Sequence, residues 1–132
     1  MLTLRKTTAD DAAFWKRLGK AMPQGGETYM LGDGAQHIGV LRYTLLWEEL
    51  PFLNLPLIRE DKRGVGYGKG ALALWEENLR AAGYCTALLS TRADENGQYF
   101  FGRYGYTACG ALDMRGFARP QPDEELFLYK NL

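Results

Sequence analysis

The chain has 132 residues, of which 46% are hydrophobic and 13% aromatic, and its sixteen cationic and sixteen anionic side chains cancel. This length and composition predict one globular domain over residues 1–132 and exclude a disordered chain. A neutral chain has no overall field that would attract nucleic acid or an anionic membrane, so any anion site requires a local cluster of cations.

Several other classes lack their sequence signals. No apolar run is long enough to span a bilayer, and the amino-terminal "MLTLRKTTADD" lacks the apolar core of a signal peptide. Cys85 and Cys109 show no CxxC spacing, so we expect no disulfide and no metal site, and we expect both side chains to be small buried hydrophobic groups in strands. The single histidine, His37, argues against a zinc site or a Ser-His-Asp triad. We therefore expect a cytoplasmic protein.

The first half of the chain predicts a strand, a helix and three further strands. Residues 2–8, "LTLRKTT", alternate as a strand does, and Thr8 with Asp11 has the spacing of a capping box. The helix that follows has its apolar residues at Phe14, Trp15, Leu18 and Met22, and "PQGGE" ends it. Residues 28–47 predict a hairpin around a glycine-containing turn. "PFLNLPLI", residues 51–58, predicts a further strand, and the charged loop "REDKRG" follows it.

From Gly66 the period changes to that of a helix, and Gly83 provides a stop. Its apolar face consists of Leu72, Trp75, Leu79 and Ala82, and Glu76 can pair with Arg80. Then follow a strand "YCTALLST", a short helix "ENGQYFFGRY" and the strands "YTACGAL" and "EELFLYKNL". This order predicts an α/β (α+β) fold with a mixed, mostly antiparallel sheet flanked by helices. The strands on either side of the 66–82 helix should be parallel, because a crossover joins them, and a ligand is expected there.

Four alternating glycines, at positions 64, 66, 68 and 70, lead into that helix. The first amides of a helix have no partner within the helix, and glycines leave room for phosphate oxygens to reach them. A local cluster of cations surrounds this loop, namely Arg59, Lys62, Arg63 and Lys69. Together these features predict a ligand that carries a diphosphate.

Two common phosphate loops, the Walker A loop and the dinucleotide fingerprint, do not account for this segment in its surroundings. A Walker A loop requires Ser or Thr after Gly-Lys, but Gly70 follows Gly68-Lys69. Residues 66–71 do fit the dinucleotide fingerprint G-x-G-x-x-A, and Asp94 lies where a ribose-binding acid is expected. However, the charged loop separates Gly66 from the preceding strand, and only 38 residues follow Asp94. That length is too short for the rest of a doubly wound domain.

Residues 63–68 match the pattern [RQ]-x-x-G-x-[GA] and resemble the acetyl-CoA pyrophosphate loop of the GNAT superfamily of N-acetyltransferases. The resemblance continues in "LTLRKTTADDAAFW", which is similar to the first strand and helix of the family, and in "HIGVLRYTLLW", whose Ile-Gly opening is typical of a family strand. "FLNLPLIREDKRGVGYGKGAL" resembles the strand-loop-helix, and "DENGQYFFGRYGYTACGAL" resembles the later block of the family. Nearly the whole chain is covered in the same order.

The resemblance implies a sheet of about seven strands that splays between strands 4 and 5, and transfer of an acetyl group from acetyl-CoA to a primary amine in a ternary complex. It assigns the pantetheine arm to main-chain groups of Leu57 and Ile58. It assigns the cofactor pyrophosphate to Arg63, Gly64, Val65, Gly66, Tyr67 and Gly68, with Lys69 and Gly70 beside it. Pro56 suits a splayed strand or an ordinary edge strand equally.

The proton-handling residues depart from the family pattern. Phe101, which the resemblance places beside the cofactor, stands where many members have a tyrosine that protonates the departing thiolate. Tyr104 is either a substitute or a packing residue. Phe52 stands where some members have a glutamate base, and Glu48 or Glu49 would act through water unless they are solvated turn residues. Asp94 takes the position of an asparagine beside the pantetheine, where an anion would favour cationic acceptors.

The acceptor itself is not specified by the sequence. Residues 20–34 and 113–123 are expected to meet it, and a peptide amine and a small polyamine fit equally. We expect a monomer or a homodimer. Because Phe52 and Phe101 are apolar, a non-catalytic acyl-CoA-binding module is the alternative function, and a dinucleotide-binding protein is a more distant one.

Overall fold

The computed structural model describes residues 1–23 and 26–132 of the chain. Its strands are β1 (Leu2–Lys6), β2 (Glu27–Asp33), β3 (Gln36–Leu46), β4 (Leu50–Ile58), β5 (Thr86–Arg92), β6 (Thr107–Leu112) and β7 (Glu125–Asn131). Its helices are α1 (Ala12–Arg17), α2 (Tyr67–Ala81) and α3 (Gly97–Arg103), with short 3-10 turns η1 (Ala9–Asp11) and η2 (Glu60–Lys62). The predicted order of strands and helices is confirmed.

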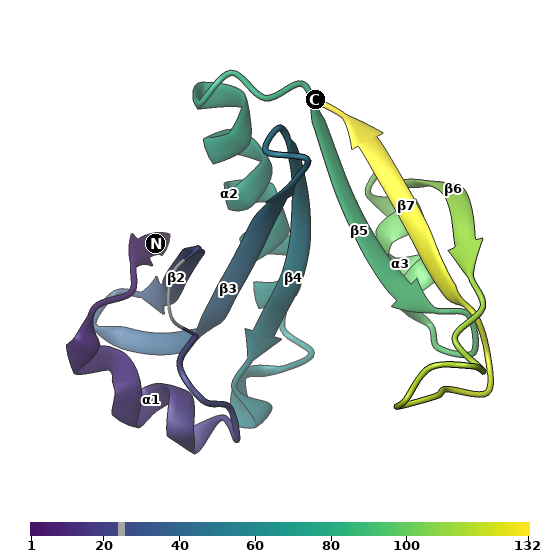
Figure 1. The fold of residues 1–132 in the computed structure, drawn as a ribbon. Helices are drawn as coiled ribbons and strands as arrows, with labels where there is room; N and C mark the ends of the chain where they lie inside the picture. Colours follow the sequence, from purple (N-terminus) through teal and green to yellow (C-terminus); the bar gives the residue numbers. More distant parts are fainter. Residues whose placement is uncertain (24–25) are drawn as a thin grey trace.

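The strands form one seven-stranded sheet in the order β1-β2-β3-β4-β5-β7-β6. Among the described strands, β4 and β5 are the parallel pair, and the other neighbours are antiparallel. This pair is joined only through Phe52 with Leu88 and Leu53 with Leu89. Beyond these residues the strands diverge, so the sheet has two halves that meet at one end of β4 (Figure 1). The predicted mixed sheet, the parallel pair and the splay are all confirmed.

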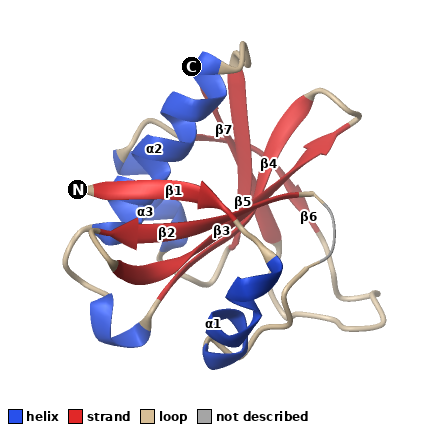
Figure 2. Cartoon of the chain, turned by 90° about the vertical axis from the view of Figure 1, so that its left-hand side faces the viewer, coloured by secondary structure: helices blue, strands red, loops and turns tan. Residues whose placement is uncertain are grey.

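Helix α2 joins the two halves from one face. Its apolar stripe packs in a core to which β2, β3 and β4 contribute Leu31, Ile38, Leu41 and Leu53, and β5 and β7 contribute Ala87, Leu89 and Leu128. Trp75 and Leu79 are each 1% exposed at the centre of that contact. Helix α3 lies on the same side of the sheet, and α1 covers the other side (Figure 2). The apolar stripe predicted for the 66–82 helix therefore connects two halves of the sheet that are joined by only two residue pairs between β4 and β5.

A buried carboxylate adds a polar link between α2 and the second half of the sheet. Glu76 is 5% exposed, accepts a hydrogen bond from the Tyr106 hydroxyl at 3.0 Å and lies 2.8 Å from the Lys130 ammonium. Arg80 approaches the same carboxylate at 3.7 Å, which confirms the predicted pair. Burial and the neighbouring carboxylate raise the pKa of Tyr106, so its hydroxyl keeps the proton that it donates.

The predicted extent of the first helix is wrong. Helix α1 ends at Arg17 and does not reach Met22, because Gly19 adopts a left-handed conformation with φ of 76°. Met22 nevertheless packs against the cluster of Phe14 and Trp15. The predicted stop "PQGGE" lies partly outside the described residues.

Cys85 and Cys109 are exposed, whereas we expected them to be buried. Cys85 precedes β5, and Cys109 lies where the register of the edge strand β6 shifts against β7. All six residues of β6 are exposed, so this strand lacks a buried face. In the described part of the chain, no helix has the length and apolarity needed to cross a membrane.

Gly39 allows β3 to lie close to the end of β4. A Cβ atom at this position would collide with the carbonyl oxygen of Leu57 and lie 3.1 Å from the Cα of Ile58. Since both neighbours are backbone atoms, neither can move without shifting β4. The bare backbone of Gly39 therefore fixes the part of β4 that borders the splay.

We predict that Gly39→Ala lowers the free energy of unfolding by about 1–3 kcal/mol, because the added methyl group overpacks the ladder. Gly102→Ala is the matched control: it lies in α3, and a Cβ there meets nothing within 4 Å. Its free energy of unfolding should stay the same or rise by up to about 1 kcal/mol. Urea unfolding of both variants checks this, and an unchanged midpoint for Gly39→Ala would contradict the proposed close approach.

Candidate functional site

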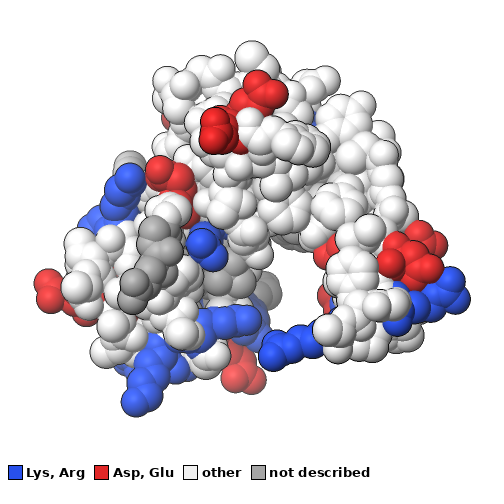
Figure 3. Space-filling view, in the orientation of Figure 1, with Lys and Arg blue, Asp and Glu red and all other residues white. Residues whose placement is uncertain are grey.

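The splay between β4 and β5 opens into a hollow between the two halves of the sheet. Figure 3 shows an opening there, with Lys and Arg side chains on the border that belongs to the β4 half. On the β5–β7 half, Asp and Glu side chains lie together with Lys and Arg side chains. Pro56 lies on β4 beyond the last residue paired with β5, so its missing N–H costs no hydrogen bond to that strand.

The glycine loop lies where β4 ends and α2 begins. Gly64 and Gly66 have φ of 79° and 94°, a left-handed conformation that a side chain disfavours. A Cβ atom on either would meet nothing within 4 Å, so the backbone is bare toward open space. Gly66 is the N-cap of α2, and the amides of the following turn have no earlier carbonyl within the helix to bind. These amides and the dipole of a 15-residue helix favour an anion at this point.

A cavity of about 320 Å³ lies against this loop and is lined by most of the residues that the sequence assigned to the cofactor. Its lining comes from the end of β4, the loop, the first turn of α2 and one face of α3, namely Ile58, Lys62, Arg63, Gly64, Gly66, Tyr67, Gly68, Lys69, Phe100 and Tyr104. The structure therefore brings Tyr104, predicted as a proton donor, together with the predicted phosphate loop.

Other predicted cofactor residues lie outside this lining. Val65 is 71% exposed, and the side chain of Leu57 packs against the cluster on the α1 side. A Cβ on Gly70 would lie 2.6 Å from the Leu2 side chain, so this glycine serves the packing of α2 against β1. Asp94 lies in the turn after β5, where Arg92 donates to its two carboxylate oxygens at 3.0 and 2.7 Å. This partner lowers the pKa of Asp94.

The resemblance places Phe101 beside the cofactor, but the residue of the Phe100–Phe101 pair that lines this cavity is Phe100. Phe101 packs toward the core with its ring centroid 5.9 Å from that of Tyr106. Phe100 lines the cavity instead, with its ring 5.0 Å from the ring of Tyr104. The signal was present in the sequence, because residues four apart lie on one helix face, and position 100 is four before Tyr104.

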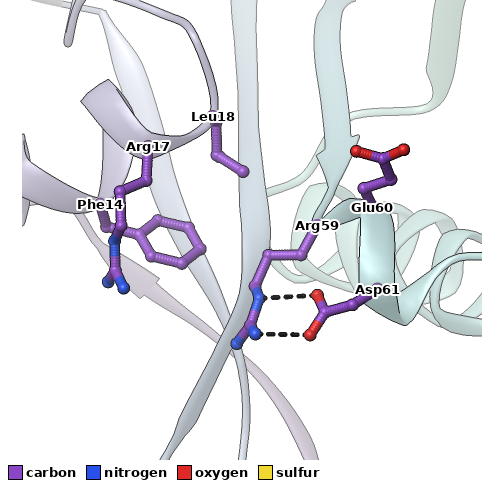
Figure 4. Close-up of a pocket in the computed structure, with 6 residues that line it drawn as sticks. All are labelled: Phe14, Arg17, Leu18, Arg59, Glu60 and Asp61. Carbon is purple, nitrogen blue, oxygen red and sulfur yellow. Dashed lines mark hydrogen bonds and ion pairs between the residues drawn. The ribbon is translucent and has the colours of Figure 1, made fainter.

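The cations of the loop divide between two cavities. Lys62, Arg63 and Lys69 line the cavity at the glycine loop, and the Arg63 Nε donates to the carbonyl of Ile58 at 2.9 Å. Arg59 lies elsewhere, in a cavity of about 280 Å³ between α1 and η2, where Asp61 holds it through contacts of 3.0 and 2.7 Å (Figure 4). The predicted cluster of four cations is therefore a cluster of three.

Two tyrosine hydroxyls belong to residues that line the cavity, and they differ in their bonding. The Tyr67 hydroxyl donates to Asp33 at 2.7 Å, and this bond raises the pKa of Tyr67. The same bond, together with the amino group of Met1 at 3.0 Å, lowers the pKa of Asp33. Tyr104 has Lys69 Nζ at 5.7 Å from its ring centroid, and no described side chain or backbone group bonds its hydroxyl. Of these two hydroxyls, that of Tyr104 has no hydrogen-bond partner among the described residues.

The two predicted glutamate bases lie at the other end of β4. Trp47 and Glu48 form the tight turn before this strand, with φ of 53° and 64°, and Glu49 borders a separate cavity with Cys85. A nine-residue strand is about 25–30 Å long, and β4 separates these carboxylates from the glycine loop by that length. The structure does not bring Glu48 or Glu49 to the cavity.

The segment 113–123, expected to meet an acceptor, lies at the carboxyl end of β5. It borders a cavity of about 430 Å³ whose lining includes the acidic residues Asp113, Asp123 and Glu124 together with Arg115. Arg115 is paired with Asp113 at 2.8 Å, and this pairing lowers the pKa of Asp113 to about 2. The other expected acceptor segment, 20–34, includes residues 24–25, which are not described.

Three solved structures show how closely this fold matches known proteins. A GNAT family acetyltransferase from Elizabethkingia anophelis, with acetyl-CoA bound, has 15% identity and a TM-score of 0.78, with 99% of this chain and 98% of that chain covered. The ribosomal-protein-S18-alanine N-acetyltransferase of Escherichia coli has 13% identity and a TM-score of 0.79, covering 99% and 94%. The spermidine/spermine N-acetyltransferase of Vibrio cholerae has 11% identity and a TM-score of 0.80, covering 98% and 92%.

No protein-family model and no curated protein matches the sequence. The structural likeness covers nearly the whole chain at low identity, and it shows that the chain has the GNAT acetyltransferase fold. The mixed sheet also differs from the doubly wound parallel sheet that the dinucleotide fingerprint would require.

We predict that the glycine loop binds inorganic pyrophosphate in a salt-sensitive way, because the cavity combines free amides with three cations. Arg63→Gln should weaken this binding about tenfold, since it removes one charge-assisted contact. Arg59→Gln is the matched control, because Arg59 is paired in the other cavity. Calorimetric titration at low ionic strength checks both, and equal losses in the two variants would place the anion elsewhere.

Proposed function

We propose that this protein transfers an acetyl group from acetyl-CoA to a primary amine by direct attack in a ternary complex. The observation that carries this proposal is the combination of a splayed β4–β5 pair with a bare, cationic glycine loop at the helix that follows. A solved structure with the same fold contains acetyl-CoA, which supports the choice of co-substrate.

The reaction has four requirements. The thioester must be held, its carbonyl oxygen must be stabilised, the amine must lose a proton, and the departing thiolate must be stabilised or protonated. In the attack a C–N bond forms and the C–S bond breaks. Coenzyme A then leaves as its thiol, and the acceptor leaves as an amide.

The cofactor would lie along β4 and end at the glycine loop. Past Leu53 one edge of β4 faces the splay, and alternate N–H and C=O groups of a strand point to that edge. We assign the pantetheine arm to main-chain groups of Leu57 and Ile58. The Ile58 carbonyl already accepts from Arg63, so the contribution of Ile58 would come from another main-chain group or follow release of that side chain.

The diphosphate would meet the amides of Gly66 to Lys69 and the side chains of Lys62, Arg63 and Lys69. These groups combine backbone donors, a helix dipole and cationic side chains, which is a common way for proteins to hold phosphate. Phe100 forms an apolar wall of the same cavity. We assign Gly70 and Phe101 to packing around this site.

Tyr104 is our candidate for protonating the thiolate. Its hydroxyl belongs to a residue that lines the cavity, and no described residue bonds it. Tyr67 is less suitable, because its hydroxyl already donates a hydrogen bond to Asp33. This choice explains how catalysis could tolerate phenylalanine at position 101.

The acceptor would approach from the acidic side of the hollow. Solved proteins of the same fold act on spermidine or spermine and on the alanine of a ribosomal protein, so both small and peptide amines fit the fold. In this chain the acidic lining at residues 113–124 favours an acceptor with positive charge. Asp94 adds less to this preference than the sequence implies, because Arg92 pairs with it. A non-catalytic acyl-CoA-binding module remains the alternative, and the presence of phenylalanine at positions 52 and 101 favours it.

Calorimetric titration should show micromolar binding of acetyl-CoA and no comparable binding of NAD or ATP. Gly66→Glu should abolish it, because a carboxylate would enter the anion site on a strained backbone. Gly83→Glu is the matched control: Gly83 has φ of 92° and equally open surroundings, but it lies at the other end of α2. A folded protein that does not bind acetyl-CoA would contradict the proposal.

Turnover with a panel of amines, including spermidine and a peptide with an amino-terminal alanine, separates an enzyme from a binding module. Tyr104→Phe should lower kcat about ten- to a hundredfold with little change in the affinity for acetyl-CoA, since it removes only a proton donor. Tyr99→Phe is the control, because Tyr99 lies on the same helix and is 67% exposed. Equal kcat values for the two variants would remove Tyr104 from the mechanism.

A further inference from the structure

Next to the splay, on the face of the sheet opposite α2, Ser90 of β5 forms a polar pair with Glu125 of β7. The proposed function uses neither residue. Side chains alternate between the faces of a strand, and Leu89 points into the core beneath α2. Leu88, Ser90 and Arg92 therefore occupy the other face. Ser90 directly follows Leu89, the last residue of β5 that pairs with β4. Its side chain is the first on this face to border the opening.

An aromatic pair closes the narrow end of the opening on this face. Phe52 and Phe127 lie with ring centroids 6.1 Å apart and span β5 between them, and Leu88 is 8% exposed beneath them. Phe127 is opposite Ser90 in the β5–β7 ladder. A thioester at the start of the splay would therefore have an apolar wall on one side and Ser90 next to it.

Ser90 is bonded to a carboxylate from the neighbouring strand. Its hydroxyl donates to Glu125 Oε2 at 2.8 Å, and Gln121 Nε2 donates to Oε1 of the same carboxylate at 3.3 Å. Glu125 is half-buried, and both of its donors are neutral. Gln121 also bonds the carbonyl of Asp123, which ties the expected acceptor segment to this carboxylate.

Glu125 has no cationic partner in the described part of the chain. Arg92 lies opposite it in the ladder, but its guanidinium bonds Asp94 at 2.7 Å and approaches Glu95 at 3.6 Å. The charged groups that line the cavity at this end of the sheet are Asp113, Arg115, Asp123 and Glu124, and Arg115 is paired with Asp113. A half-buried carboxylate with only neutral donors is suited to a cation that arrives from outside.

We propose that Glu125, positioned by Ser90, binds the acceptor as its ammonium ion and accepts the proton that the amine must lose. This inference rests on the proposed acetyl transfer. It supplies the base for which β4 has only Phe52 and for which Glu48 and Glu49 are too remote.

The step balances in atoms and charge. One N–H proton passes from the ammonium to a Glu125 oxygen, which leaves a neutral amine and a carboxylic acid. The amine lone pair forms the C–N bond to the thioester carbon, and the C–S bond breaks to release the thiolate. The new amide nitrogen still carries one extra proton, and the thiolate takes a proton from Tyr104 or water. The amide nitrogen then gives its extra proton back to that donor, directly or through water, and Glu125 returns its own proton to solvent when the amide leaves.

Glu125→Gln tests this role with the amine of the panel that the wild-type protein acetylates fastest. We expect kcat/KM for the amine to fall about a hundredfold at pH 7, the usual scale for losing a general base. The variant must use amine that is already neutral, so its kcat/KM should rise with pH up to the pKa of the free amine. The wild type should depend less steeply on pH over the same range, because Glu125 takes the proton from the bound ammonium. For Ser90→Ala we expect kcat/KM for the amine to fall about tenfold, with the same pH dependence as the wild type.

Acetyl-CoA affinity and melting temperature serve as controls for binding and folding, and both should match the wild type in each variant. Glu77→Gln is the matched control substitution, since Glu77 is exposed on α2 and should keep full activity. A Glu125→Gln variant with kcat/KM within twofold of the wild type and the same pH profile would overturn the inference while leaving the proposed function intact. A wild-type protein that does not bind acetyl-CoA would overturn both.

Discussion

The short contact between β4 and β5 is the constraint on which the rest of the structure depends. Two residue pairs are too few to join two halves of a sheet, so the apolar stripe of α2 and the buried Glu76 cluster must hold them from one face. Because the support comes from one face only, the strands can separate below Leu53 and Leu89 without loss of the core. The same short pairing that weakens the sheet thus creates its opening.

The charged groups around this opening are unevenly distributed. The β4 side presents free amides of α2 with Lys62, Arg63 and Lys69. The β5–β7 side presents Glu125 and the 113–124 region, where acidic residues outnumber the one lining cation, Arg115. Local fields of opposite sign can therefore attract an anionic cofactor and a cationic acceptor to the two sides of one hollow, although the net charge is zero. The apolar Phe52–Phe127 pair lies at its narrow end, where water would compete with the reaction.

Much of this could be predicted from the sequence because the signals are local. The hydrophobic period predicts the order of the elements, and the crossover predicts the parallel pair. The glycine loop and its cations predict the cavity where we propose the anion binds. The remainder depends on contacts that local patterns do not encode. Ser90 and Glu125 lie 35 residues apart and meet only through the β5–β7 register. Arg59 bonds Asp61 and lies in one cavity, whereas Arg63 bonds the Ile58 carbonyl and lies in another, and the sequence does not specify these partners. The exposure of Cys109 follows from the position of β6 at the edge of the sheet.

The most direct test of this account is to follow the backbone amide resonances while acetyl-CoA is added. Binding in the hollow should shift the amides of Gly64 to Lys69, the β4 residues beyond Leu53 and the β5 residues from Ser90 onward, and leave the turn at Trp47 unchanged. Shifts that instead gather around Arg59 and α1, or resonances that do not move at saturating acetyl-CoA, would contradict the claim that the splayed strands and the glycine loop form the cofactor site.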